Sequence, residues 1–228
     1  MTGAPARADD NARTLAAYEQ RAQLYREQTR GAGGGAVDAL LRTLATQAPE
    51  GTVLEIGSAH GRDADVLESL GRQVRRTDAT RAFVEMQRAD GHVADVLDVL
   101  TDRLVDETVG PYAAVLADAV FLHFTPAQLR TVLVKVRDAL VAGGLLGFTV
   151  KVGEGSEWST HKLGVPRFFH YWQPAALRAE IEAAGLEVVA LEVESGPVVD
   201  WIVVICTPVL PPSPPPPPGG DSSASMSG

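Results

Sequence analysis

The sequence predicts an α/β fold: a Rossmann-like sheet of seven mostly parallel strands with helices on both faces. The chain has 228 residues, 45% of them apolar, and a single core can support a domain of roughly this size. Short β-branched runs alternate with longer segments of helical period, the order typical of parallel strands joined by crossover helices. The last two strand candidates are separated only by residues 194–198, too few for a parallel crossover. We therefore expect one antiparallel strand near the C-terminus.

The expected elements follow in chain order. Two helices come first, at 12–29 and 36–47. The strand candidates are 52–56, 73–77, 92–95, 113–117, 145–151, 186–193 and 199–207, with helices at 62–70, 82–88, 126–141 and 174–184 between them. The helix at 126 has the clearest start signal, with Thr125 as N-cap, Pro126 in the first position and Gln128 placed for a capping box. We expect a helical lid over 1–50, a core over 51–209 and a Pro/Gly/Ser-rich tail without fixed structure over 210–228.

Charge and composition limit the classes of partner that the protein is expected to bind. The net charge of −9 repels nucleic acid and anionic membranes, so neither is an expected partner. The chain has no run of roughly 20 apolar residues and no apolar segment near its start, which predicts a soluble, cytoplasmic protein. The single cysteine, Cys206, lies in an apolar run and is expected to be a buried thiol. We expect no metal site, and a monomer or homodimer.

One glycine turn carries most of the functional signal. An apolar strand runs through Glu55 into Gly57 and Gly61 and then into a helix that begins near Arg62 and includes Asp63. Asp78 ends the next strand, where a carboxylate can accept both hydroxyls of a ribose. The spacing is not the G-x-G-x-x-G of dinucleotide sites, and two acids beside the turn would repel a pyrophosphate. They suit a ligand with a cationic amino acid end, as in S-adenosylmethionine.

At these residues the sequence resembles class I S-adenosylmethionine-dependent methyltransferases. The matching stretches are LEIGSAHGRD (54–63), RRTDAT (75–80), ADV (94–96), YAAVLADAVFLHFTP (112–126) and LVAGGLLGFTVK (140–151), within a resemblance that spans about residues 15–208. The resemblance implies S-adenosylmethionine as cofactor. It also implies these contacts: Glu55, Gly57 and Gly61 in the cofactor loop, Asp63 and Asp118 near the methionyl end, Asp78 and Ala79 at the ribose, and Asp95 and Val96 against the adenine. The family often has a third glycine where this chain has Ala59.

A second segment suggests where an acceptor binds. Residues 151–172 hold five of the thirteen aromatic residues, interleaved with charged ones, and follow the fifth strand on the ligand side of the sheet. We expect this segment to close over an organic acceptor, although a loop that merely covers the sheet end would look similar. The expected substrate-binding residues are Lys151, Trp158, Arg167 and Phe169, together with Tyr18 and Tyr25 from the amino-terminal helix. Lys151 and Arg167 favour an acceptor with a carboxylate or phosphate, whereas a tyrosine stripe at helical spacing is more often ordinary helix packing.

The chemistry of methyl transfer asks little of the protein. It is an in-line displacement in which a sulfonium becomes a neutral thioether, so alignment in a dry site is the main requirement. A hydroxyl acceptor makes a base useful, and the candidates are His123 first, then His170 or Tyr171. His123 is equally typical of a core histidine. We expect transfer to an oxygen or nitrogen of a small organic metabolite, in specialised biosynthesis. The alternatives are a nicotinamide-dependent oxidoreductase and a non-catalytic S-adenosylmethionine-binding module.

Overall fold

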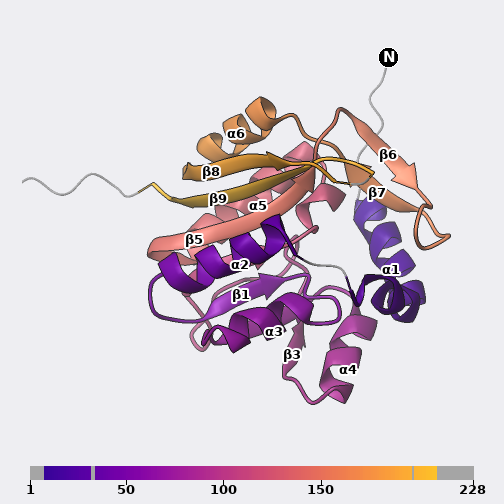
Figure 1. The fold of residues 1–228 in the computed structure, drawn as a ribbon, viewed down its shortest axis with the longest axis horizontal. Coiled ribbons are helices and arrows are strands. Elements are labelled where there is room, and N and C mark those ends of the chain that lie inside the picture. The colour runs from indigo at the N-terminus through magenta and orange to yellow at the C-terminus, as the bar shows by residue number, and fades with distance from the viewer. Residues whose placement is uncertain (1–7, 32–33, 197, 210–228) are drawn as a thin grey trace, which may run out of the picture.

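The computed structural model describes residues 8–31, 34–196 and 198–209, and it has the expected seven-stranded sheet (Figure 1). The strand order is β3-β2-β1-β4-β5-β9-β8. The strands of this sheet are β1 (Val53–Ile56), β2 (Val74–Asp78), β3 (Ala94–Val96), β4 (Tyr112–Ala117), β5 (Leu140–Lys151), β8 (Leu186–Glu194) and β9 (Trp201–Pro208). The first five are parallel, and β9 runs antiparallel to both of its neighbours, β5 and β8. The single reversed strand near the C-terminus is confirmed. The tail expected at 210–228 lies outside the described residues.

Helices cover both faces of the sheet. They are α1 (Ala8–Thr29), α2 (Ala36–Gln47), α3 (Arg62–Ser69), α4 (Arg81–Ala89), the short 3-10 helix η1 (Phe121–His123), α5 (Pro126–Ala139) and α6 (Pro174–Ala183). One apolar cluster joins α2 and α3 to the sheet, and a second, larger one joins α5 and α6 to its other face. In the part of the chain that the structure describes, no helix combines the length and apolarity needed to cross a membrane.

The strand order places a crevice at the centre of the sheet. β1 pairs with β2 on one side and with β4 on the other, so the crossovers that leave these strands turn in opposite directions. Every residue of β1 and β4 is buried, as expected for central strands covered on both faces. In open parallel sheets, ligands bind outside the carboxyl ends of the strands at such a switch point. The fold therefore positions a site beyond the ends of β1, β2 and β4.

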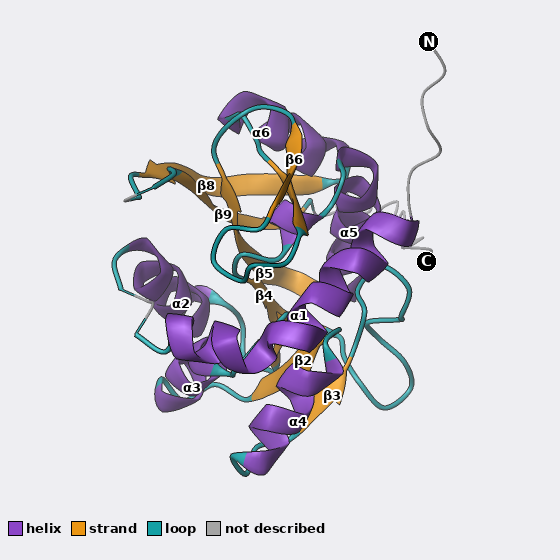
Figure 2. Ribbon diagram, turned by 90° about the vertical axis from the view of Figure 1, so that its right-hand side faces the viewer, coloured by secondary structure: helices purple, strands orange, loops and turns teal. Residues whose placement is uncertain are grey.

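The second helix belongs to the core rather than to a lid. Leu40 and Leu44 of α2 are buried against the sheet, and Gly147 of β5 makes room for them. A Cβ at Gly147 would lie only 2.8 Å from Leu40 Cδ1 and 2.9 Å from Leu44 Cδ1. The expected division at residue 50 thus separates parts that pack together. Among the described residues, α1 is the helix that lies as a lid, across the carboxyl ends of the strands (Figure 2).

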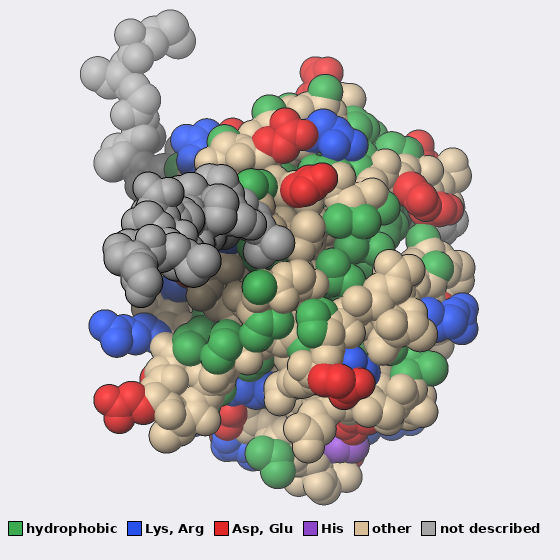
Figure 3. Space-filling view, turned by 90° about the vertical axis from the view of Figure 1, so that its left-hand side faces the viewer, with side chains coloured by type: hydrophobic (Ala, Val, Ile, Leu, Met, Phe, Trp, Pro, Cys, Tyr) green, Lys and Arg blue, Asp and Glu red, His purple; other side chains and the backbone are tan. Residues whose placement is uncertain are grey.

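The segment after β5 forms a small hairpin that the sequence did not predict. β6 (Ser156–Ser159) and β7 (Arg167–His170) pair antiparallel in a sheet of their own, next to α1 and η1 (Figure 2). The expected helix at 126–141 ends earlier, at Ala139, because β5 begins at once with Leu140. Its capping box between Thr125 and Gln128 is confirmed. The side of the molecule opposite to that shown in Figure 2 carries charges of both signs around hydrophobic side chains (Figure 3).

Candidate functional site

Two adjoining pockets lie beneath α1 at the crevice. The first is narrow, with a cavity volume of about 90 Å³. The second is wider, at about 620 Å³, and extends toward α2 and the β6–β7 hairpin; this volume is within the range of roughly 300–1,000 Å³ usual for small-molecule sites. Both pockets are lined by Tyr25 of α1, by Gly57 and Ala59 after β1, and by Asp118 and Ala119 after β4. The two spaces meet at this shared wall, so one ligand can lie beside another there.

The turn between β1 and α3, residues 57–61, is the floor of the site and is called the cofactor loop below. Gly57 and Gly61 have φ angles of +74° and +88°, which favour glycine. A Cβ on Gly57 would lie 2.4 Å from Val120 Cγ2. The loop backbone can therefore keep this position only without a side chain at residue 57. Ala59 also has a positive φ, +47°, which a non-glycine residue adopts at a cost of about 1 kcal/mol or more. This conformation explains why related chains often have glycine at that position.

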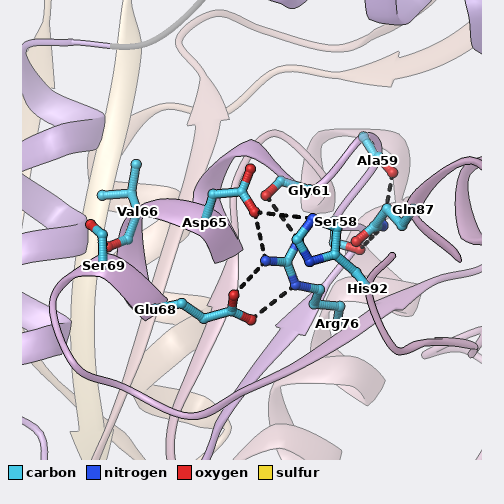
Figure 4. Close-up of polar contacts among 10 residues, drawn as sticks. All are labelled: Ser58, Ala59, Gly61, Asp65, Val66, Glu68, Ser69, Arg76, Gln87 and His92. Carbon is cyan, nitrogen blue, oxygen red and sulfur yellow. Dashed lines mark hydrogen bonds and ion pairs between the residues drawn. The ribbon is translucent and has the colours of Figure 1, made fainter. Parts of the chain in front are cut away.

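A buried arginine supports the cofactor loop from behind (Figure 4). Arg76 of β2 is 2% exposed and donates to both oxygens of Glu68, at 3.0 and 2.7 Å. It also donates to Asp65 at 2.6 Å and to the carbonyl of Gly61 at 3.3 Å. The guanidinium therefore joins the first turns of α3 to the end of the loop.

A glutamine completes this support. Gln87 of α4 is fully buried and its amide nitrogen donates to the hydroxyl of Ser58 and to the carbonyl of Ala59 (Figure 4). A Cβ on Gly61 would lie 2.6 Å from Arg76 Nη1 and 2.9 Å from Gln87 Oε1. Gly61 is therefore needed both for its backbone conformation and for this close packing.

Two carboxylates meet where the pockets adjoin: Asp118 lines both pockets, and Asp63 lines the second. Asp63 of α3 and Asp118 after β4 share a side-chain hydrogen bond, and Thr149 of β5 donates to Asp118 at 2.6 Å. Burial, followed by the charge of Asp118, raises the pKa of Asp63 to about 7. Arg62, which bonds to Asp63 and to Asp38 of α2, opposes this rise, while Asp38 itself adds to it. Without a ligand, the positive charge of Arg62 is therefore too little to offset the burial and mutual repulsion of the two carboxylates.

Two further acids surround the loop. Asp78 at the end of β2 is 6% exposed, lines the first pocket with Ala79, and accepts hydrogen bonds from the backbone N–H groups of Ala59 and Thr80. Burial raises the pKa of Asp78 to about 6 despite these two donors. Glu55 in β1 is 3% exposed, its Oε2 has no hydrogen-bond partner, and burial raises its pKa well above the usual range. Four acids thus converge on the cofactor loop.

A hydrogen-bonded chain ties α1 to the far side of the site. The hydroxyl oxygen of Tyr18 lies 2.8 Å from His123 Nε2, and His123 Nδ1 lies 2.6 Å from the carbonyl oxygen of Phe168. Because a carbonyl only accepts, Nδ1 carries the ring proton and Nε2 accepts from the tyrosine hydroxyl. Arg167 in turn donates to Tyr18 at 3.0 Å. Burial and the charges of Arg167 and Lys151 lower the pKa of His123 to about 3, so its ring is neutral.

Three cationic side chains lie on the hairpin side of the tyrosines. Lys162 lines the second pocket, and its Nζ lies 5.1 Å from the ring centre of Tyr25. Arg167 and Lys151 lie 5.0 and 4.1 Å from the ring centre of Phe169. Each distance is within the range of a cation–π contact. Charges of both signs therefore lie near the tyrosines, and Asp118 and Arg167 both act on Tyr25.

The side chains expected against an adenine lie elsewhere. Asp95 forms an ion pair with Arg75 at 3.1 Å and lines a separate surface depression, and Val96 is 40% exposed. Residues 97–99, the next three along the chain, line the first pocket instead. The chain turns inward only after β3 ends, which the short ADV stretch does not reveal.

Three other predicted residues are engaged within the hairpin. His170 Nδ1 lies 2.7 Å from the hydroxyl of Ser156, and Tyr171 donates to Glu157 at 2.6 Å. Burial and Glu157 raise the pKa of Tyr171 to about 12, which makes its phenolate a rare form at neutral pH. Trp158 packs beneath an arginine of α1. These contacts hold the hairpin and lid together and lie outside both pocket walls as described.

Several supporting residues were missed by sequence reasoning. Arg76 lies in the run before Asp78, and Gln87 is a polar residue of a helix. Neither position carries a local signal of its supporting role. Thr149 had a usable signal, because it is the one hydroxyl in the apolar run LLGFTV. Lys162 lies in the expected acceptor segment, and only the folded hairpin brings it beside Tyr25.

Comparison with known proteins identifies the fold. No protein-family model matches the chain, and no curated protein matches it. Among solved structures, the CcbJ methyltransferase from Streptomyces caelestis matches with a TM-score of 0.68 and 19% identity over 85% of this chain and 98% of that one. A 1,6-didemethyltoxoflavin-N1-methyltransferase from Burkholderia thailandensis, solved with 1,6-didemethyltoxoflavin and S-adenosylhomocysteine, gives 0.66 and 17% over 90% and 92%. The glycopeptide N-methyltransferase MtfA, complexed with S-adenosylmethionine, gives 0.59 and 16% over 75% and 93%.

The chain has the class I methyltransferase fold. In this methyltransferase fold, the pockets described above occupy the switch point of the sheet, where the strand order reverses.

Replacement of Asp63 by asparagine should stabilise the ligand-free protein. Its raised pKa means that ionisation is harder in the folded chain than in the unfolded one, so the charge destabilises the fold. This penalty is absent below the ordinary aspartate pKa of 3.8, grows as the pH rises, and is complete above about 7. Thermal melts should show D63N gaining little at pH 4 and most at pH 8, where each 1 kcal/mol corresponds to about 2–4 °C.

The exposed Asp138 of α5 provides the matched control. Its side chain is 62% exposed, so D138N should change the melting temperature little at either pH. A D63N variant that melts at a lower temperature than the unsubstituted protein at pH 8 would show that the acid pair is not repulsive.

Proposed function

We propose that this protein transfers a methyl group from S-adenosylmethionine to an oxygen or nitrogen of a small organic metabolite. The observation that carries the proposal is the acid pair Asp63–Asp118 in a methyltransferase fold, where Asp118 lines both pockets and Asp63 lines the second. A carboxylate pair of raised pKa favours a cationic ligand, because a positive charge replaces the proton that the acids otherwise share.

The residues present fit the methyl donor. S-adenosylmethionine carries an ammonium and a sulfonium, which suit the acids beside the cofactor loop, and a nucleoside, which suits the first pocket. Asp78 is placed to accept from ribose hydroxyls, since each of its oxygens has a lone pair beyond the backbone bond it accepts. Residues 97–99 would then lie at the base. Glu55 lines neither pocket and takes no direct part in this fit. Gly57 lines both pockets, and its lack of a side chain lets a ligand approach the backbone.

When bound, the donor supplies an electrophilic methyl group on a sulfonium. The chain's own contribution is placement in a site closed to water. α1 forms the roof with Tyr18 and Tyr25, and the β6–β7 hairpin closes the acceptor side. The second pocket, beside the shared wall, is where an acceptor would meet the donor.

His123 acts in this proposal as a positioning residue. Its pKa of about 3 makes it a poor base at neutral pH, and both ring nitrogens are already engaged. It holds the hydroxyl of Tyr18, which lines the pocket, and through Phe168 it fixes the hairpin. The acceptor's own proton then leaves to solvent or buffer, and the nucleophile needs alignment more than deprotonation.

Calorimetry and thermal melts with separate cofactors test the proposal. S-adenosylmethionine at a hundred times its dissociation constant should add about 2.7 kcal/mol of stability, whereas NADH should add none. Labelled methyl groups should then pass from the donor into a small molecule of a fractionated cell extract, identified by mass. D78N should weaken donor binding, and the exposed D138N should not.

The outcomes distinguish the three candidate functions: methyltransferase, oxidoreductase and non-catalytic binding module. Stabilisation by NADH alone favours the oxidoreductase. Binding of the donor without any methylated product favours a binding module and contradicts the enzymatic proposal.

Substitution of His123 tests its positioning role. Because a base of pKa about 3 is fully deprotonated between pH 5 and 9, H123N should lower kcat by one factor across that range. Loss of one or two hydrogen bonds, at about 1 kcal/mol each, corresponds to a decrease on the order of ten-fold. Y18F should show a similar decrease, since it breaks the same chain. A rising alkaline limb that H123N abolishes would instead identify His123 as the base.

A further inference from the structure

Three basic residues beside the second pocket have no acidic partner, and they are called the basic cluster: Lys151, Lys162 and Arg167. Among the ion pairs formed by the described residues, none includes a member of this cluster. Buried charges are normally paired, because removal of an ion from water costs several kcal/mol. A cluster of three like charges without acids is therefore a feature that needs an explanation.

Arg167 is the most constrained member. It is 5% exposed, and it donates to Tyr18 at 3.0 Å and to the carbonyl of His161 at 2.7 Å. Its Nε is buried and has no hydrogen-bond partner. Both hydrogen-bond partners are neutral, and the rings of Tyr18 and Phe169 lie against the guanidinium, so no carboxylate of the described residues pairs with its charge.

The two lysines are affected by the same imbalance. Burial and the charge of Arg167 lower the pKa of Lys151 and that of Lys162, and Lys162 also lowers that of Lys151. The acid that acts on Lys151 is Glu157, and its carboxylate already accepts from Tyr171. An anion bound here would thus relieve repulsion among three cations rather than compete with an existing salt bridge.

Aromatic rings surround the cluster and give it a shape. Lys162 lies over Tyr25, and Lys151 lies 5.9 Å from the ring centre of Trp201. Tyr25 and Trp201 both line the second pocket, as does Lys162. The same pocket is also lined by three acids, Asp63, Asp118 and Glu194. The positive charge next to the ring of Tyr25 comes from Lys162. Flat rings beside this charge suit a planar body with an anionic end.

We propose that the methyl acceptor is a planar aromatic acid whose carboxylate is held by the basic cluster, with its ring against Tyr25 and Trp201. The inference rests on the proposed methyl transfer and names the substrate class of that same site. Lys162 is the exposed member and lines the second pocket, so it makes the direct contact. Arg167 and Lys151 line neither pocket and contribute through their charge.

Benzoate and benzamide test this class directly, because they have nearly the same shape and differ in charge. Their binding is measured by calorimetry at low ionic strength on the full chain saturated with S-adenosylhomocysteine, since salt screens exposed charges. Benzoate should bind at least about ten-fold more tightly than benzamide, a difference of 1.4 kcal/mol. R167Q and K162Q should each lower benzoate affinity several-fold and leave that of benzamide unchanged.

Two controls keep the outcomes distinct. Arg130 of α5 is 57% exposed and paired with Glu180, so R130Q should change neither affinity. If R167Q fails to fold, the exposed K162Q still decides. Equal affinities for the two probes, or an unchanged benzoate affinity in K162Q, would overturn the inference.

A separate measurement distinguishes a failure of the donor site from a failure of the anion site. Binding of S-adenosylhomocysteine is measured first, and its absence contradicts the proposed methyl transfer rather than the anion site. If the homocysteine product binds and the probes are not distinguished, the proposed function stands and only the acceptor class is wrong.

Discussion

Repulsion between buried carboxylates is the constraint on which the site depends. Asp63 and Asp118 are held together by the fold: one begins a helix after β1, the other follows β4, and Thr149 fixes the second from β5. Such a pair destabilises the empty protein at neutral pH, and a cationic ligand removes the destabilisation. The fold tolerates this arrangement because Arg76 and Gln87 hold the cofactor loop through contacts that do not involve the pair.

The site also carries charges of both signs. Acids surround the cofactor loop, and members of the basic cluster lie against the rings of Tyr18 and Tyr25. Burial raises the pKa of Tyr25, Asp118 adds to the rise and Arg167 opposes it, so both signs of charge act at this ring. Charges of both signs beside one continuous space are a physical basis for placing a cationic donor beside an anionic acceptor.

Sequence reasoning recovered what is local and missed what is brought together by the fold. The seven strands, the reversed β9 and the capping box at Thr125 follow from periodicity, loop length and helix-start chemistry, all of which act over a few residues. The cofactor loop and Asp78 were predicted because a strand, a glycine turn and a distant acid occur in one register. The β6–β7 hairpin was missed because its four-residue strands lie among glycines and charges that resemble a loop. The ion pair of Asp95 with Arg75 and the support of the loop by Gln87 depend on contacts between segments distant in the chain.

The proton count of ligand binding tests the central claim most directly. Calorimetric titrations with S-adenosylmethionine in two buffers of different ionisation enthalpy give the number of protons released at each pH. If the ligand's positive charge replaces the shared proton of Asp63 and Asp118, about half a proton or more should leave at pH 7, falling toward none by roughly pH 9. Tight binding with no proton release at pH 7, and with an affinity that does not change between pH 6 and 9, would contradict the account.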